Sequence, residues 1–447
     1  MASKGNAGAS SGDANRPSSS VEELLLAALA RGDNSLTTGR YLVSFKEGAA
    51  EQALQSLASQ GMRVADAREY PGQAVQMETL GDADAVVLPE IGVALVGGDA
   101  ARERGMSIQS ETDADSPIET VEPEYFMFID GAADYMQAFA RASDQAPDDY
   151  LRGFLRAAEV LSQELRGSPR PQLDDEEEAM VLGATWGLKA CRVPPSARSG
   201  LGIRVAVLDT GMDLGHPEFA GRPFETRSFV GQAVQDLHGH GTHCIGTACG
   251  PKAPSGAIPR YGIAHRSHIY VGKVLTNSGS SVGFSTLNGM NWAIAQRCAV
   301  ISMSLGSQSP VQTAFTNAGQ AALNNGLLII AAAGNAASGT GAPANSPTIM
   351  SVASLDPNLA PSNFSNFGKI DIAAPGRDVF SSVPRPQLHG IKNGTSMATP
   401  HVAGCAALWA ETSPALRGIN LWRKLQATAR KLPFPGTRVG AGLVQAP

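Results

Sequence analysis

Residues 394–404 read Gly-Thr-Ser-Met-Ala-Thr-Pro-His-Val-Ala-Gly, which places Ser396 just before an apolar helical stretch. Because proline has no backbone N–H, we expect Pro400 to lie in the first turn of this helix. Free N–H groups at a helix N-terminus can stabilise negative charge that develops beside the Ser396 hydroxyl. A Gly-Thr-Ser string is also typical of an ordinary helix cap, so this stretch needs support from elsewhere in the chain.

Other strings supply the polar groups that an activated serine requires. Asp209 ends an apolar run, His240 lies within the string HGHGTHC, and Asn335 follows the apolar string that ends in AAAG. A carboxylate can hold an imidazole, the imidazole can take a proton from a hydroxyl, and an amide N–H can bind an oxyanion. Each string alone is also typical of a turn. Together with Ser396, they predict one catalytic crevice.

The second half of the chain alternates short apolar strands with helices. We expect strands in the runs 203–208, 269–275, 300–303, 327–332 and 349–352, and helices near 287–296 and 313–324. Fully apolar strands that alternate with helices indicate a mostly parallel sheet covered by helices on both faces. The sequence therefore predicts an α/β domain over residues 183–447, with its active site at the carboxyl ends of the strands.

The first part of the chain has a different organisation. Residues 39–129 show a compact α+β pattern, with strand patterns at 41–45, 62–67, 85–96 and 125–129 and a helical pattern at 49–59. We expect residues 1–38 to be disordered apart from a short helix opened by the capping box of Ser20 and Glu23. We expect residues 130–182 to be a linker with an amphipathic helix from Leu151 to Leu165 and an acidic run at 174–178.

Composition narrows the classes of function. The chain has 447 residues, a net charge of −6 and 43% hydrophobic residues, so we expect two or three folding units and no nucleic-acid partner. No apolar run approaches the ~20 residues of a membrane span. Glu22 and Glu23 precede the apolar segment 24–30, where an export signal carries positive charge. We therefore favour an intracellular location, with secretion as the alternative.

The cysteine and histidine pattern leaves one further interpretation open. His238, His240 and His243, with Cys244, could together bind a metal, although their spacing matches no recognised zinc motif. The chain has five cysteines and no CxxC pair, and because five is an odd number, at least one thiol should be free unless it pairs between chains. The five cysteines are Cys191, Cys244, Cys249, Cys298 and Cys405.

The strings DTG, HGTHC, SLG, AAAGN and GTSMATPHVAG, in this order and spacing, resemble the subtilisin-like serine proteases, or subtilases. The motifs are most similar to the proteinase K and subtilisin branches, and the resemblance runs from about Trp186 to the C-terminus. It implies a serine endopeptidase that acts on polypeptides through an acyl-enzyme and needs no cofactor for its chemistry.

The resemblance also assigns roles to residues. It implies that Ser396 is the nucleophile, that His240 is the general base and then the acid, and that Asp209 orients the imidazole. Asn335 and the backbone N–H of Ser396 would bind the oxyanion. The substrate backbone would contact Gly279, Ser280, Ser281, Ser304, Leu305, Gly306, Ala333 and Gly334. Because Ala336 replaces an acid found in some relatives, we expect apolar or aromatic residues before the scissile bond.

Residues 39–129 resemble the family's inhibitor-type propeptide, a ferredoxin-like domain, and Val121-Glu-Pro-Glu124 resembles its acidic end. This implies a self-processed zymogen in which the segment after Phe126 lies in the crevice, inhibits the enzyme and is cut by it. Glu218 stands where some relatives bind calcium through an Asp, but residues 250–261 do not resemble their calcium loop. A structural calcium thus has no recognised site in this sequence.

Two other functions use the same fold. One is a catalytically silent binding module, although such proteins usually lose a triad residue and none is lost here. The other is a peptide ligase or cyclase, in which an amine resolves the acyl-enzyme in place of water.

Overall fold

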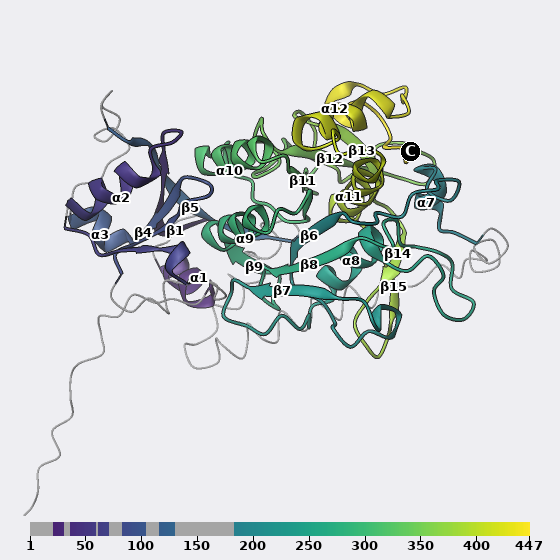
Figure 1. Ribbon diagram of the computed structural model, residues 1–447, viewed down its shortest axis with the longest axis horizontal. Coiled ribbons are helices and arrows are strands. Elements are labelled where there is room, and N and C mark those ends of the chain that lie inside the picture. The colour runs from purple at the N-terminus through teal and green to yellow at the C-terminus, as the bar shows by residue number, and fades with distance from the viewer. Residues whose placement is uncertain (1–20, 31–35, 60, 71–82, 104–115, 130–182) are drawn as a thin grey trace, which may run out of the picture.

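The computed structural model describes residues 21–30, 36–59, 61–70, 83–103, 116–129 and 183–447. The predicted disorder of residues 1–20, the helix of 151–165 and the acidic run at 174–178 lie outside these residues. The described chain forms a smaller N-terminal unit (36–129) and a larger C-terminal unit (183–447) that contact each other (Figure 1).

The N-terminal unit is one sheet with helices on one face. Its elements are β1 (Thr37–Phe45), α2 (Ala50–Ser59), β2 (Val64–Asp66), η1 (Ala67–Glu69), β3 (Ala85–Leu88), β4 (Val93–Val96), α3 (Gly98–Glu103) and β5 (Ile118–Phe128). The strands lie in the order β2-β3-β4-β1-β5, of which β3-β4-β1-β5 is the ferredoxin-like arrangement. The strand expected at 62–67 is shorter because Asp66 caps η1 by accepting the N–H of Arg68.

The C-terminal unit is built on a seven-stranded sheet in the order β13-β12-β11-β10-β6-β8-β7, and every neighbouring pair is parallel. Its strands are β6 (Arg204–Asp209), β7 (Phe224–Ser228), β8 (His268–Lys273), β10 (Val300–Met303), β11 (Leu328–Ala332), β12 (Met350–Leu355) and β13 (Ile372–Pro375). The helices are α7 (Trp186–Ala190), α8 (His240–Cys249), α9 (Gly283–Ala295), α10 (Thr313–Asn324), α11 (Thr395–Thr412), α12 (Gly418–Thr428) and α13 (Gly436–Val439). Short elements complete it: η3 (Pro217–Phe219), β9 (Ser280–Val282) and the hairpin β14 (Val379–Ser382) to β15 (His389–Lys392).

The sheet is buried on both faces, as the apolar strands predict. Along β6, Val205 and Val207 belong to a core shared with α8 and α11, whereas Ala206 and Leu208 belong to a core shared with α9 and α10. This alternation follows from the two-residue period of a strand. The predicted parallel sheet with helices on both faces is confirmed.

The two units share a core. The N-terminal sheet faces α9 and α10, and its Leu42, Leu88 and Leu95 join the cluster that contains Phe284 and Phe315. The N-terminal sheet therefore covers the outer face of the α9–α10 layer.

Helix α11 corrects one expectation. It begins at Thr395, so Ser396 lies inside it and Pro400 lies beyond its first turn. The proline leaves the carbonyl of Ser396 without its usual i+4 donor. Ser304 Oγ, at 2.7 Å, and Cys244 Sγ, at 3.5 Å, donate to that carbonyl instead. Side-chain donors from neighbouring elements thus allow proline within the helix.

All five cysteines are free and buried. In the part of the chain that the structure describes, no helix is long and apolar enough to cross a membrane. The cellular location stays a prediction.

Candidate active site

The four predicted polar groups meet at the carboxyl edge of the parallel sheet. Asp209 ends β6, His240 begins α8, Asn335 follows β11 and Ser396 lies in the first turn of α11. Asp209 and Ser396 are each 1% exposed and His240 is 3% exposed. Gly239, which precedes His240, has φ of 87°, a left-handed conformation that glycine adopts without strain. The turn into α8 therefore requires a residue without a Cβ.

His240 is held by Asp209. Its Nδ1 donates to Oδ1 of Asp209 at 2.8 Å, and the same oxygen accepts the N–H of Thr210 at 2.7 Å. Burial by itself lowers the pKa of His240, but the charge and hydrogen bond of Asp209 outweigh it and hold that pKa well above its ordinary value. The arrangement stabilises an imidazolium and leaves Nε2 as the atom that can exchange a proton.

The hydroxyl of Ser396 is bonded elsewhere in this structure. It donates to the carbonyl of Ser304 at 3.3 Å. Nε2 of His240 is buried and has no hydrogen-bond partner among the described residues. The bond between nucleophile and base is therefore not formed in this state, and such bonds often form only when substrate is bound.

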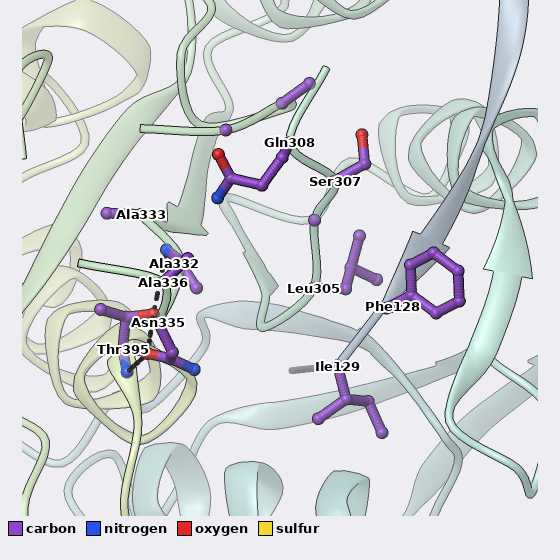
Figure 2. Close-up of a pocket in the computed structure, with 14 residues that line it drawn as sticks. Phe128, Ile129, Leu305, Ser307, Gln308, Ala332, Ala333, Asn335, Ala336 and Thr395 are labelled. Carbon is purple, nitrogen blue, oxygen red and sulfur yellow. Dashed lines mark hydrogen bonds between the residues drawn. The ribbon is translucent and has the colours of Figure 1, made fainter. Parts of the chain in front are cut away.

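The side chain of Asn335 is fixed by the residue before the serine. Its Oδ1 accepts the N–H of Thr395 at 2.8 Å and the hydroxyl of Thr395 at 2.9 Å (Figure 2). The amide nitrogen lies on the other side, 3.3 Å from where a Cβ of Gly394 would be. The amide donor therefore lies beside the segment that carries Ser396.

A buried acid that the sequence analysis missed organises the turn before His240. Oδ1 of Asp236 accepts the N–H groups of His238 and Gly239 at 3.0 and 2.8 Å. It also accepts the hydroxyl of Thr210 at 2.9 Å, while Oδ2 accepts the N–H of Thr242 at 2.9 Å. Asp236 thus joins the residue after Asp209 to both sides of His240.

Lys273 is a second residue that was missed. Its ammonium is fully buried and donates to the carbonyl of Thr210 and to Oδ1 of Asn277. Burial lowers its pKa to about 8, against the opposing effect of Asp236 and Asp209. A lysine within the apolar run 269–275 is the signal that could have identified it, because lysine is rarely buried without partners.

The metal interpretation of the histidine string does not fit the geometry. Among the described residues, the only group of three potential ligands is Asp209, His240 and Cys244, which excludes His238 and His243. The ring of His243 is buried and hydrogen-bonded to the carbonyl of Val379 at 2.9 Å. The three histidines therefore do not converge on one point.

Glu218 is also engaged by protein groups. Its Oε2 accepts the hydroxyl of Tyr261 and lies 3.0 Å from Nε2 of His389. Within the described ranges, no cluster of ligand side chains surrounds it. These contacts give no support to a calcium site at Glu218.

The crevice is filled by the N-terminal unit. Strand β5 pairs antiparallel with β9, so that Met127 lies opposite Ser281 and Phe128 opposite Ser280. On its other edge, Phe128 exchanges two hydrogen bonds of 2.9 Å with Gly306. The next N–H, of Ile129, donates to the carbonyl of Gly279 at 3.1 Å.

The predicted substrate-binding segments are therefore the two borders of one gap. Gly279, Ser280 and Ser281 lie on one border and Gly306 lies on the other. Ser304 lies deeper, where its hydroxyl binds the carbonyl of Ser396. A strand in this gap is bonded along both edges.

A pocket opens beside the end of this strand (Figure 2). Leu305, Gly306, Ala333 and Gly334, all predicted to contact substrate, line it. The other lining residues are Phe128, Ile129, Ser307, Gln308, Ala332, Asn335, Ala336, Gly341, Ala342 and Thr395. None of these side chains is charged, so the pocket suits an uncharged group.

Comparisons with known proteins identify the family of the C-terminal unit. Residues 200–442 match the Subtilase family. An alkaline protease of Alkalihalobacillus alcalophilus is 38% identical over 280 residues, which cover 61% of this chain and 71% of that protein. Subtilisin Savinase of Lederbergia lenta is 38% identical over 268 residues, or 58% of this chain and 96% of that protein. A cold adapted subtilisin-like serine proteinase of known crystal structure has a TM-score of 0.52 and 31% identity, covering 59% of this chain and 98% of that chain.

Proposed function

Because the chain belongs to the subtilase family and is a serine endopeptidase, we propose that Asp209, His240 and Ser396 are its catalytic triad. The observation that carries this assignment is the 2.8 Å bond between Asp209 and the ring of His240, at the sheet edge where Ser396 also lies. Asn335 and the N–H of Ser396 are the oxyanion donors.

The chemistry follows from these positions. The Ser396 hydroxyl leaves the Ser304 carbonyl, turns to Nε2 of His240 and attacks the peptide carbonyl as its proton passes to that nitrogen. The oxyanion is stabilised by the amide donor of Asn335. His240 then protonates the departing amine, and water, activated by the same ring, hydrolyses the ester on Ser396. Asp209 stabilises the imidazolium throughout.

The substrate is an extended polypeptide that occupies the gap between β9 and Gly306. Backbone hydrogen bonds on both borders supply affinity without regard to sequence. The uncharged pocket supports the expected preference for apolar or aromatic residues before the scissile bond. Comparing hydrolysis of peptides with Phe, Leu or Lys at that position tests this, and a preference for Lys contradicts it.

We further propose that the N-terminal unit is an inhibitor and that the chain is a self-processed zymogen. The hydrogen bonds of Phe128 and Ile129 support this, because they occupy the borders that substrate needs. The acidic string 121–124, in the middle of β5, adds anchors at two helix N-termini. Glu122 accepts the N–H of Thr313 at 2.8 Å, and Glu124 accepts the N–H of Phe284 at 2.8 Å. The cut then falls downstream of Ile129.

Replacing Ser396 by Ala in the full-length chain tests both proposals. Peptide hydrolysis should fall about a million-fold, the loss that subtilisin itself suffers from such a change. Mass spectrometry should show the precursor uncut, whereas the control Ser413→Ala, at the far end of α11, should be cut and active. Self-processing by Ser396→Ala would exclude the serine mechanism. Wild-type protein that resists a fluorophosphonate would favour a silent binding module, and transfer of peptides to an added amine would favour a ligase.

A further inference from the structure

Helix α1 (Val21–Ala30) precedes the N-terminal unit and contacts the C-terminal unit directly. It contacts β1 and β9, the two strands that flank β5 (Figure 1). Its apolar face forms a cluster with side chains of β5 and β9, which we call the α1 contact. The α1 contact consists of Val21, Leu24, Leu25, Ala28, Phe126, Phe128 and Val282, with Leu36 packed against it.

The α1 contact is separate from the core of the N-terminal unit. That core lies under α2 and α3 and includes Val43, Phe45 and Leu57, none of which belongs to the α1 contact. The buried face of α1 is instead directed at β5 and β9. Leu25 is 0% exposed and Phe126 is 0% exposed, so the packing is complete at its centre. Burial on this scale is a substantial source of binding free energy.

The alternation along β5 explains why α1 matters to the crevice. Phe126 and Phe128 point to α1, whereas Met127 points to the core shared with α9 and α10. Phe128 is also the residue whose backbone bonds to Gly306. The strand in the gap is therefore covered on one face by α1 and on the other by the shared core, and it is bonded along both edges.

We propose that α1 is a clamp on the inhibited form. It binds the apolar surface made by Val282 of the C-terminal unit together with Phe126 and Phe128, and so slows the departure of the strand from the gap. The partner that fits Val282 and its surroundings is thus the apolar face of the chain's own N-terminal helix. This proposal rests on the proposed function, because it takes the gap between β9 and Gly306 as the substrate site.

Hydrogen exchange in the Ser396→Ala chain tests the clamp without any need for catalysis. The amides of Phe128, Ile129 and Gly306 report whether the strand is seated, since each donates across the gap. Leu25→Asp, which places a charge in the α1 contact, should speed exchange of these amides at least about tenfold. Leu25→Ala keeps a strong helix former and should act in the same direction. Gln55→Ala, on the exposed side of α2, is the control and should leave exchange unchanged.

The possible results distinguish a failure of the clamp proposal from a failure of the proposed self-processing. Exchange in both Leu25 variants that equals the Gln55→Ala control overturns the clamp. Faster exchange throughout β1, β3 and β4 also overturns it, because α1 would then be part of the N-terminal fold and not a clamp on the gap. In the active chain, the delay between cutting and full peptidase activity should shorten by a similar factor in Leu25→Ala. If the wild-type chain is never cut, self-processing fails while the exchange result still decides the role of α1.

Discussion

At the scale of single residues, the site depends on how burial and charge compete at His240. A buried imidazole would ordinarily lose its proton easily, but the carboxylate of Asp209 lies 2.8 Å from Nδ1 and reverses the direction of the pKa shift. Protonated His240 cannot accept the proton of Ser396. Peptidase activity should therefore fall as the pH falls through the raised pKa of this ring.

The Asp209→Asn variant separates the effect of burial on the pKa of His240 from the effect of the carboxylate charge. Without the carboxylate charge, burial lowers the pKa of His240, so the acid limb of kcat/KM should move to lower pH. The turnover number should also fall, by about 10⁴-fold, as in subtilisin. Profiles measured from about pH 5 to about pH 10 show the shift. The exposed control Asp378→Asn should keep the wild-type profile, and an unmoved limb in Asp209→Asn would show that Asp209 does not set the pKa.

Lys273 gives a second pH dependence, this time of stability. Burial lowers its pKa from 10.5 to about 8, so the unfolded chain binds more protons than the folded chain between these values. Lys273 should therefore contribute a rise of up to about 3 kcal/mol in the free energy of unfolding across that window, while the buried cysteines, whose pKa values are raised, contribute in the opposite direction. Urea unfolding of Ser396→Ala at several pH values measures it. Adding Lys273→Met should remove this contribution and make the slope of the unfolding free energy against pH more negative, whereas the exposed Lys252→Met should leave the slope unchanged. Equal slopes in all three proteins would refute this origin.

At the scale of elements, buried periodic segments were predictable and polar ones were not. Helix α10 (Thr313–Asn324) has the predicted bounds, and the strand over 300–303 is β10. Strand β7 was missed because its residues are half-buried or exposed and, after Phe224, polar, so its sequence carries no apolar run. Pro400 was misplaced because local rules cannot foresee that Ser304, from another element, satisfies the carbonyl that proline leaves free. The proposed triad residues were visible as sequence motifs, whereas Asp236 acts through hydrogen bonds to backbone N–H groups and threonine hydroxyls that only folding brings together.

At the scale of the whole molecule, the N-terminal unit is attached by several independent contacts. Glu122 and Glu124 cap α10 and α9, the sheet shares a core with these helices, and β5 fills the gap. A carboxylate at a helix N-terminus is favoured by both the hydrogen bonds and the helix dipole. The sequence predicted this unit and its place in the crevice through a resemblance, but it did not reveal the role of α1.

Glu122→Ala should weaken this attachment. It removes the acceptor for the N–H groups of Thr313 and Ala314, so unfolding of the Ser396→Ala chain should require about 1–2 kcal/mol less free energy. Chemical denaturation measures the change. Glu119→Ala is the matched control, since Glu119 contacts Asn317 of the same helix from an exposed position and should contribute less. Equal losses in the two variants would argue against a cap.

The gap between β9 and Gly306, the proposed substrate site, also limits which polypeptides the enzyme can hydrolyse. Phe128 fits there because its N–H and C=O groups both form hydrogen bonds across the gap to Gly306. Chains wound into helices or locked inside sheets have those groups engaged and cannot thread in. Unfolded polypeptide, such as flexible tails, exposed linkers and heat-denatured proteins, can enter the gap. We therefore expect the enzyme to select its substrates by their lack of stable structure more than by their amino-acid sequence. Its own folded domain should resist digestion for the same reason.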